Sequence, residues 1–121
     1  MKFPAWYGIS VGILMILQWM FSIVTEGVPE FETTPWAIGF HLAAEFSTAL
    51  MLIVGGIAVL RSTRWGKQLL TVGLGMVLYS EIVSPGYFAQ LGQWALVGMF
   101  AILLFGAVWS TMTLIREGIN Q

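Results

Sequence analysis

Residues 35–67 read PWAIGFHLAAEFSTALMLIVGGIAVLRSTRWGK, and this stretch decides the fold. Its apolar part, from Pro35 to Leu60, exceeds the ~20 residues that an α-helix needs to cross the hydrocarbon core of a bilayer. Thr34 and Pro35 predict the start of this helix, because threonine caps free amides and proline suits the first turn. The basic turn at residues 61–67 ends it. The stretch therefore predicts a transmembrane helix and an aqueous loop.

The composition extends this conclusion to the whole chain. Of its 121 residues, 58% are hydrophobic and 9% are charged, whereas soluble domains contain about 25% charged residues. These values exclude a water-soluble domain and indicate a single membrane domain, residues 1–121. The formal net charge of −1 argues against nucleic acid as a partner. The absence of cysteine excludes disulfides and thiolate metal sites, which leaves histidine, glutamate and neutral polar groups for chemistry.

Four apolar segments predict four spans, at about residues 4–25, 35–60, 68–84 and 89–115. The first is too long for the apolar core of a secretory signal, which is about 7–15 residues. We expect the third span to stop at Ser84-Pro85-Gly86, because proline lacks an amide donor. The loops between spans are short, so the fold class is an all-α, integral membrane four-helix bundle with up-down topology.

The charges predict the orientation of this bundle. Every lysine and arginine falls on one side of an alternating four-span arrangement, and the positive-inside rule makes that side cytoplasmic. Both termini are then cytoplasmic, and the acidic loop with Glu26, Glu30 and Glu32 faces the other way. The expected location is the plasma or inner membrane, with the lipid bilayer as a partner. The basic residues are Lys2, Arg61, Arg64, Lys67 and Arg116.

Glycines predict close contacts between helices. Gly8 and Gly12 form a G-x-x-x-G motif in the first span, and small residues of this kind let two helix backbones approach. Such contacts fit packing within one bundle or the interface of a homo-oligomer. Further glycines of this type are Gly55, Gly56, Gly73, Gly75, Gly98 and Gly106.

Three ionisable residues fall within the spans, where lipid makes an isolated charge costly. His41 and Glu45 are four residues apart and share one face of the second span, and Glu81 lies at a similar depth in the third. We expect the three side chains to meet. Gln18 and Ser22 of the first span lie in the same half of the bilayer. Together they predict a polar ligand-binding pocket that opens to the extracytoplasmic face above an apolar plug.

Several chemistries fit these residues. Glu45 and Glu81 could share one proton or one cation, with His41 as donor, ligand or acid. The three residues could instead hold a divalent metal ion, although the sequence leaves the cofactor open. The alternative is structural: the three could only hydrogen-bond across helices, with about 0.6 to 2 kcal/mol from each contact.

Two resemblances accompany this reading. In size and four-span layout the chain resembles the small DoxX-like membrane proteins. His41, Glu45 and Glu81 are similar to the acid/base set of the sterol isomerase family related to emopamil-binding protein. That likeness implies stabilisation of a cationic intermediate by tryptophan, with Trp19, Trp36 or Trp94 as counterparts. Small multidrug transporters carry a carboxylate within their first helix, whereas here Glu26 stands at its end.

Three functions follow as hypotheses. The first is binding of a cation or small ligand, with proton-linked transport by an oligomer as its extension. The second is an acid/base enzyme, isomerase-like, that acts on a lipophilic substrate entering from the bilayer. The third is an accessory subunit of a larger membrane complex.

Overall fold

The computed structural model describes residues 2–25 and 30–119, and all its regular structure is helical. Helix α1 spans Lys2–Val24, the single turn α2 spans Glu30–Thr33, and α3 spans Pro35–Leu60. Helix α4 spans Gly66–Gln90 and α5 spans Trp94–Ile119. The four long helices are each long and apolar enough to cross a membrane. The all-α architecture with four helices of spanning length is therefore confirmed. Of the acidic loop expected at residues 26–33, residues 26–29 lie outside the described residues, and residues 30–33 form the helical turn α2.

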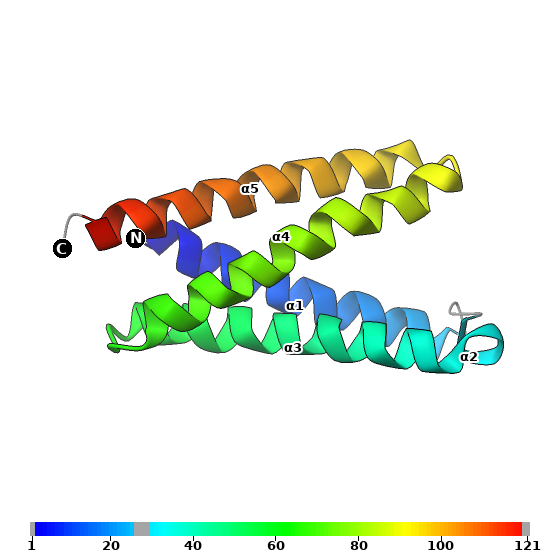
Figure 1. Cartoon of the computed structure of the whole chain (residues 1–121), viewed down its shortest axis with the longest axis horizontal. Helices are drawn as coiled ribbons and strands as arrows, with labels where there is room; N and C mark the ends of the chain where they lie inside the picture. Colours follow the sequence, from blue (N-terminus) through cyan, green and yellow to red (C-terminus); the bar gives the residue numbers. More distant parts are fainter. Residues whose placement is uncertain (1, 26–29, 120–121) are drawn as a thin grey trace.

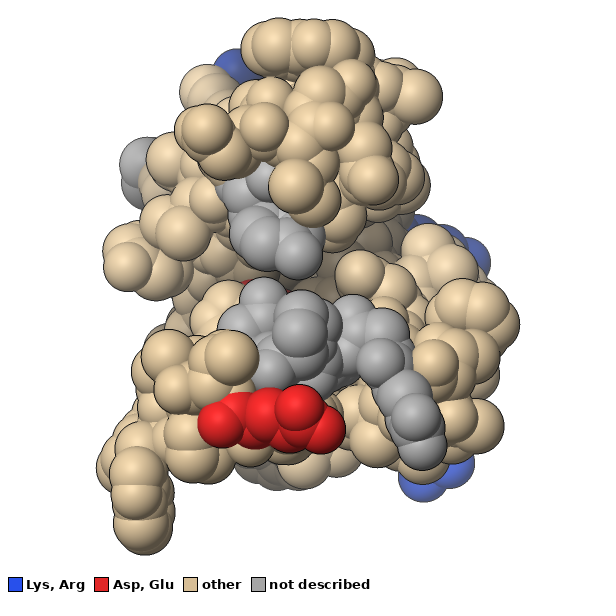
Figure 2. All heavy atoms as spheres, turned by 90° about the vertical axis from the view of Figure 1, so that its right-hand side faces the viewer, with Lys and Arg blue, Asp and Glu red and all other residues tan. Residues whose placement is uncertain are grey.

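The long helices are antiparallel to their neighbours (Figure 1). The most extensive contacts join α1 to α3, α3 to α4 and α4 to α5. The start of α1, the end of α5 and the α3–α4 turn lie at one end of the molecule (Figure 1). This end is here termed the basic end, because it carries Lys2, Arg61, Arg64 and Arg116. The opposite end, with α2 and the α4–α5 turn, is termed the acidic end. Figure 2 views the acidic end and shows acidic side chains over its lower part, where α2 lies.

Glycine brings α3 into backbone contact with both of its neighbours. A Cβ atom on Gly55 would lie 2.7 Å from the backbone nitrogen of Leu70 in α4. A Cβ atom on Gly56 would lie 2.6 Å from the carbonyl oxygen of Ala5 in α1. Because these distances are shorter than any ordinary van der Waals contact, only glycine allows this spacing. Gly8, Gly12, Gly73 and Gly106 also face other helices, whereas Gly75 and Gly98 face open space.

The bundle is packed at its basic end and splayed at its acidic end. In α1 the buried residues all precede Ile13, and in α5 the buried residues Ala107, Ser110 and Leu114 all belong to the second half. None of residues 13–25 or 94–106 is buried. The α4–α5 pair accordingly diverges from the α1–α3 pair toward the acidic end (Figure 1). The core cluster comprises Val11, Leu52, Leu70, Leu74, Val77, Ala107 and Leu114.

The end expected for the third span is wrong. Helix α4 passes through Pro85 and continues to Gln90. Proline removes one helical hydrogen bond, which an apolar helix tolerates when its remaining bonds and packing hold it. The actual terminator is Gly92, whose φ of 75° supplies the left-handed residue that follows many helices. The amide of Gly92 donates to the carbonyl of Ala89, and that of Gln93 donates to the carbonyl of Phe88. The last long helix consequently begins at Trp94 and not near residue 89.

The ends of α3 are built differently from each other. Pro35 stands in the first turn as expected, but the Thr34 hydroxyl makes no capping bond to the described helix amides. Its backbone carbonyl accepts a bond from the Ile38 amide at 3.0 Å. At the other end Ser62 takes the left-handed conformation, with φ 57°. The amides of Ser62 and Thr63 donate back to the last turn of the helix.

Candidate functional site

His41 and Glu45 lie on one face of α3, one turn apart, as their spacing predicted. The His41 Nε2 atom is 3.7 Å from the Glu45 Oε1 atom, a distance that makes an ion pair when the imidazole is protonated. Glu45 is 8% exposed, whereas His41 is exposed. The indole of Trp19 in α1 meets the imidazole edge-on, with ring centroids 5.6 Å apart. Trp19 therefore limits how far the His41 ring can turn from Glu45.

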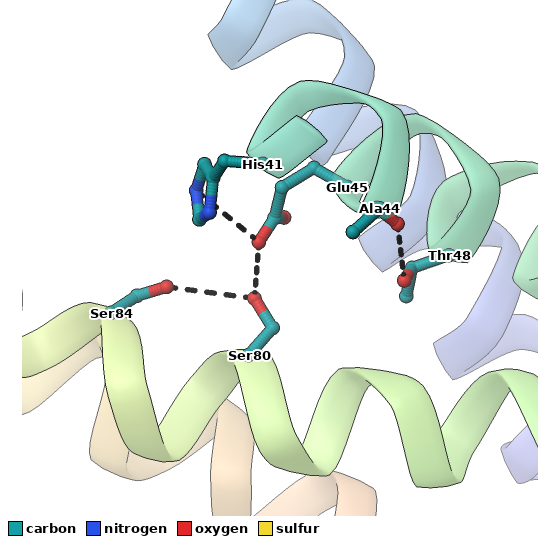
Figure 3. Close-up of polar contacts among 6 residues, drawn as sticks. All are labelled: His41, Ala44, Glu45, Thr48, Ser80 and Ser84. Atoms are coloured by element: carbon teal, nitrogen blue, oxygen red, sulfur yellow. Dashed lines mark hydrogen bonds and ion pairs between the residues drawn. The ribbon is translucent and has the colours of Figure 1, made fainter. Parts of the chain in front are cut away.

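Helix α4 supplies two hydroxyl groups to the same carboxylate (Figure 3). The Ser80 hydroxyl donates to Glu45 Oε1 at 2.8 Å, and the Ser84 oxygen lies 3.5 Å from the Ser80 oxygen. Ser80 and Ser84 are four residues apart, so both face α3. One oxygen of Glu45 is thus the point at which an imidazole from its own helix and a hydroxyl from the next helix converge.

A cavity of about 140 Å³ lies beside these groups, between α3 and α4. Both helices line it with residues spaced three or four apart, so each contributes a single face. Tyr79 is 73% exposed and Val83 is 50% exposed, so the cavity opens on the outer flank of the α3–α4 pair. Its lining residues are His41, Ala44, Glu45, Thr48, Met76, Tyr79, Ser80, Val83 and Ser84.

Glu81 does not join this cavity, and the expected meeting of His41, Glu45 and Glu81 is wrong. The side chain of Glu81 points toward α1 and α5, where the Tyr7 hydroxyl lies 2.9 Å from its Oε1 atom. Consecutive residues of a helix project about 100° apart. Because Ser80 is the residue of α4 that faces Glu45, its neighbour Glu81 must face elsewhere.

The divalent metal site expected from these residues also fails. Across residues 2–25 and 30–119, no group of three histidine, cysteine, aspartate or glutamate residues is arranged to hold a metal ion. His41 and Glu45 provide only two such ligands at the cavity. The acid/base set suggested by the isomerase resemblance is likewise divided between two places in the fold.

Gln18 and Ser22 do not line the cavity either. Gln18 is exposed, and the backbone carbonyl of Ser22 accepts a 3.4 Å bond from the Thr25 hydroxyl. Trp19 is the residue of α1 that reaches His41. Glu26, considered for its place at the end of the first span, lies outside the described residues.

Sequence reasoning missed Tyr7, Ser80 as a partner of Glu45, and Ser84 as part of the lining. Tyr7 is the one phenol in the first helix, and a buried phenol requires a hydrogen-bond partner. This requirement could have indicated that Tyr7, in the otherwise apolar first half of α1, contacts a polar group on another helix.

These features define a small all-helical protein of four apolar, membrane-length helices with a cavity on one flank, beside the Glu45 carboxylate. The chain belongs to the family described as a domain of unknown function (DUF8058), whose model matches residues 1–121. No curated protein and no solved structure matches the chain.

Proposed function

We propose that the protein spans a membrane and binds a small organic cation in the cavity between α3 and α4. The observation that carries this proposal is the buried carboxylate of Glu45, which faces the cavity beside His41 and Ser80. Ionisable residues inside a membrane helix are costly and commonly mark ligand or ion pathways. A purely structural glutamate would not need a cavity beside it.

The size and lining of the cavity favour an ammonium group with a few carbon atoms. An engineered cavity of about 150 Å³ holds benzene, so about 140 Å³ accommodates a molecule of similar size. The Glu45 carboxylate would receive the positive charge, and the Ser84 hydroxyl would accept a further hydrogen bond. Met76, Val83 and Ala44 provide apolar walls for the carbon atoms, and the phenol of Tyr79 provides an aromatic one. An isolated metal ion would find fewer ligands here.

Binding is linked to a proton through His41. A protonated imidazole and a cationic ligand compete for Glu45 Oε1, because His41 Nε2 lies 3.7 Å from that atom. The ligand would therefore bind with release of the His41 proton. If the bound cation crosses the membrane, this exchange supplies the coupling for proton-linked transport.

The proposed orientation places the basic end in the cytoplasm, in accordance with the positive-inside rule. The cavity then lies in the extracytoplasmic half of the bilayer. Since the chain has no cysteine, single substitutions give clean probes. In sealed cells a membrane-impermeant thiol reagent should label Gln93→Cys and spare Ser62→Cys. Labelling of Ser62→Cys alone would reverse the proposed orientation.

The binding proposal is tested by calorimetry on the purified protein with methylammonium, tetramethylammonium and tetraethylammonium chloride. We expect saturable binding of one of the two smaller ions, its loss in Glu45→Gln, and weaker binding in Ser84→Ala. Glu32→Gln is the matched control, because it removes an exposed carboxylate of α2 that is remote from the cavity. Binding that Glu45→Gln leaves unchanged would contradict the proposal, as would no binding of any of the three ions. Flux of the bound ion into proteoliposomes then separates transport from binding alone.

A further inference from the structure

Glu81 lies where three helices meet, away from the cavity. It belongs to α4 and is 3% exposed. Tyr7 of α1 reaches it with its hydroxyl, which also lies 2.5 Å from the backbone carbonyl oxygen of Leu103 in α5. The Tyr7 ring packs on Gly106, where a Cβ atom would come within 2.6 Å of the ring. This contact, here termed the Glu81–Tyr7 clasp, joins α1 to the α4–α5 pair at the place where the two pairs begin to diverge.

The number of protons available determines how the clasp is bonded. A backbone carbonyl can only accept, so Tyr7 must donate its proton to Leu103 at the shorter of its two contacts. A phenol has one proton and therefore has none left for Glu81. Tyr7 could donate to Glu81 Oε1 only by giving up Leu103, so both contacts are full hydrogen bonds at the same time only if Glu81 donates to the Tyr7 oxygen. A glutamate donates only when its carboxyl group carries a proton.

The second oxygen of Glu81 provides an independent argument. Glu81 Oε2 is buried and has no hydrogen-bond partner in the described part of the chain. An ionised carboxylate spreads its charge over both oxygens, and a buried oxygen with half of that charge and no donor is unfavourable. In the same residues no lysine, arginine or histidine lies within ion-pair distance of Glu81. Glu45, the acid on neighbouring α3, is turned away and bonded to Ser80.

We infer that Glu81 is a proton-binding site, occupied in this arrangement of the helices, with Tyr7 as the group that responds to its proton. When the proton is present, the clasp runs from Glu81 to Tyr7 to the Leu103 carbonyl and ties α4, α1 and α5 together. When the proton leaves for water, Tyr7 must turn its own proton to the Glu81 carboxylate and give up Leu103. Release of the proton therefore loosens α1 from α5.

Infrared difference spectroscopy on the protein in lipid bilayers tests this inference without any ligand. A protonated carboxyl group absorbs in a region free of carboxylate and amide bands, and its band shifts in heavy water. At pH 7 we expect one such band in wild type and in Glu45→Gln, and its absence in Glu81→Gln. In Tyr7→Phe the band should persist at higher frequency, because the carboxyl group has lost its acceptor.

Two results would overturn the inference. One is a wild-type spectrum at pH 7 with no protonated carboxyl band. The other is a band that disappears in Glu45→Gln and remains in Glu81→Gln. If Glu81→Gln does not fold, a change in the band frequency in Glu81→Asp and in Tyr7→Phe still assigns the protonated carboxyl band to Glu81. No cation is added in this experiment. A negative infrared result would therefore not affect the calorimetric test of cation binding in the α3–α4 cavity.

Discussion

Ser80 and Glu81 are consecutive residues of α4, yet their side chains bond to different helices. Ser80 donates to Glu45 in α3, and Glu81 pairs with Tyr7 in α1. The two polar contacts therefore share one turn of one helix, on faces about 100° apart. Any rotation of α4 about its axis would therefore move both side chains together.

The bond between Ser80 and Glu45 should be measurable as a coupling energy. In a double-mutant cycle of Ser80→Ala and Glu45→Ala, we expect the two changes to couple by about 0.6 kcal/mol and no more than about 1.7, the range found for hydrogen bonds between membrane helices. Unfolding in mixed micelles gives the four free energies. Ser10→Ala, an exposed serine of α1, should show no coupling to Glu45→Ala. A zero value for the Ser80 cycle would remove this contact from the site.

Gly55→Ala should destabilise the bundle by about 1–3 kcal/mol, the usual cost of an added methylene in a tight contact. The new Cβ atom would meet the backbone of Leu70, which cannot move without separating α3 from α4. Gly39→Ala is the matched control in the same helix, because nothing lies within 4 Å of its Cβ position. The measurement is the unfolding midpoint in detergent. Equal midpoints for the two variants would contradict the close approach of these helices.

Ser62→Gly should raise stability by about 0.5–1 kcal/mol. Ser62 has a φ of 57°, where a side chain is strained and glycine is not. The side chain is exposed, so its removal costs little packing. Thermal unfolding in detergent measures the gain. Ser10→Gly, in the interior of α1, should lower stability instead, and a fall for Ser62→Gly would be inconsistent with the left-handed turn.

Affinity for the proposed cation should rise with pH, by up to about tenfold per unit for one linked proton. The protonated His41 competes with the cation for Glu45, and this competition disappears when the imidazole loses its proton. In His41→Gln the dependence of affinity on pH should be weaker. Titration calorimetry at successive pH values gives both slopes. Identical slopes would exclude His41 as the competing group.

Much of the architecture could be predicted from the amino-acid pattern because apolar length and charge placement are properties of each helix alone. The pairing of His41 with Glu45 also depended on one helix, through its four-residue spacing. The partner of Glu45 depended on the rotation of α4 about its axis, and a shift of one residue exchanges Ser80 for Glu81. The sequence of α4 does not show which of the two residues faces α3. Glu81 was therefore expected beside Glu45, where the structure has the Ser80 hydroxyl.

The misplaced end of α4 has a similar origin. Ser84-Pro85-Gly86 combines residues that commonly stop a helix. In the sequence this was a stronger stop signal than the single glycine at position 92. The helix nevertheless passes through Pro85 and continues to Gln90. The left-handed conformation of Gly92 then ends it.

Pro85 has a mechanical consequence for α4. Lacking an amide hydrogen, it leaves the backbone carbonyl of Glu81, four residues earlier, without the bond that a helix would normally give it. Bending is therefore easiest within the turn that joins Glu81 to Pro85, directly beyond the clasp. A small flexure there would swing the last turns of α4, and the start of α5 with them, toward or away from α1 while the packed basic end stays still.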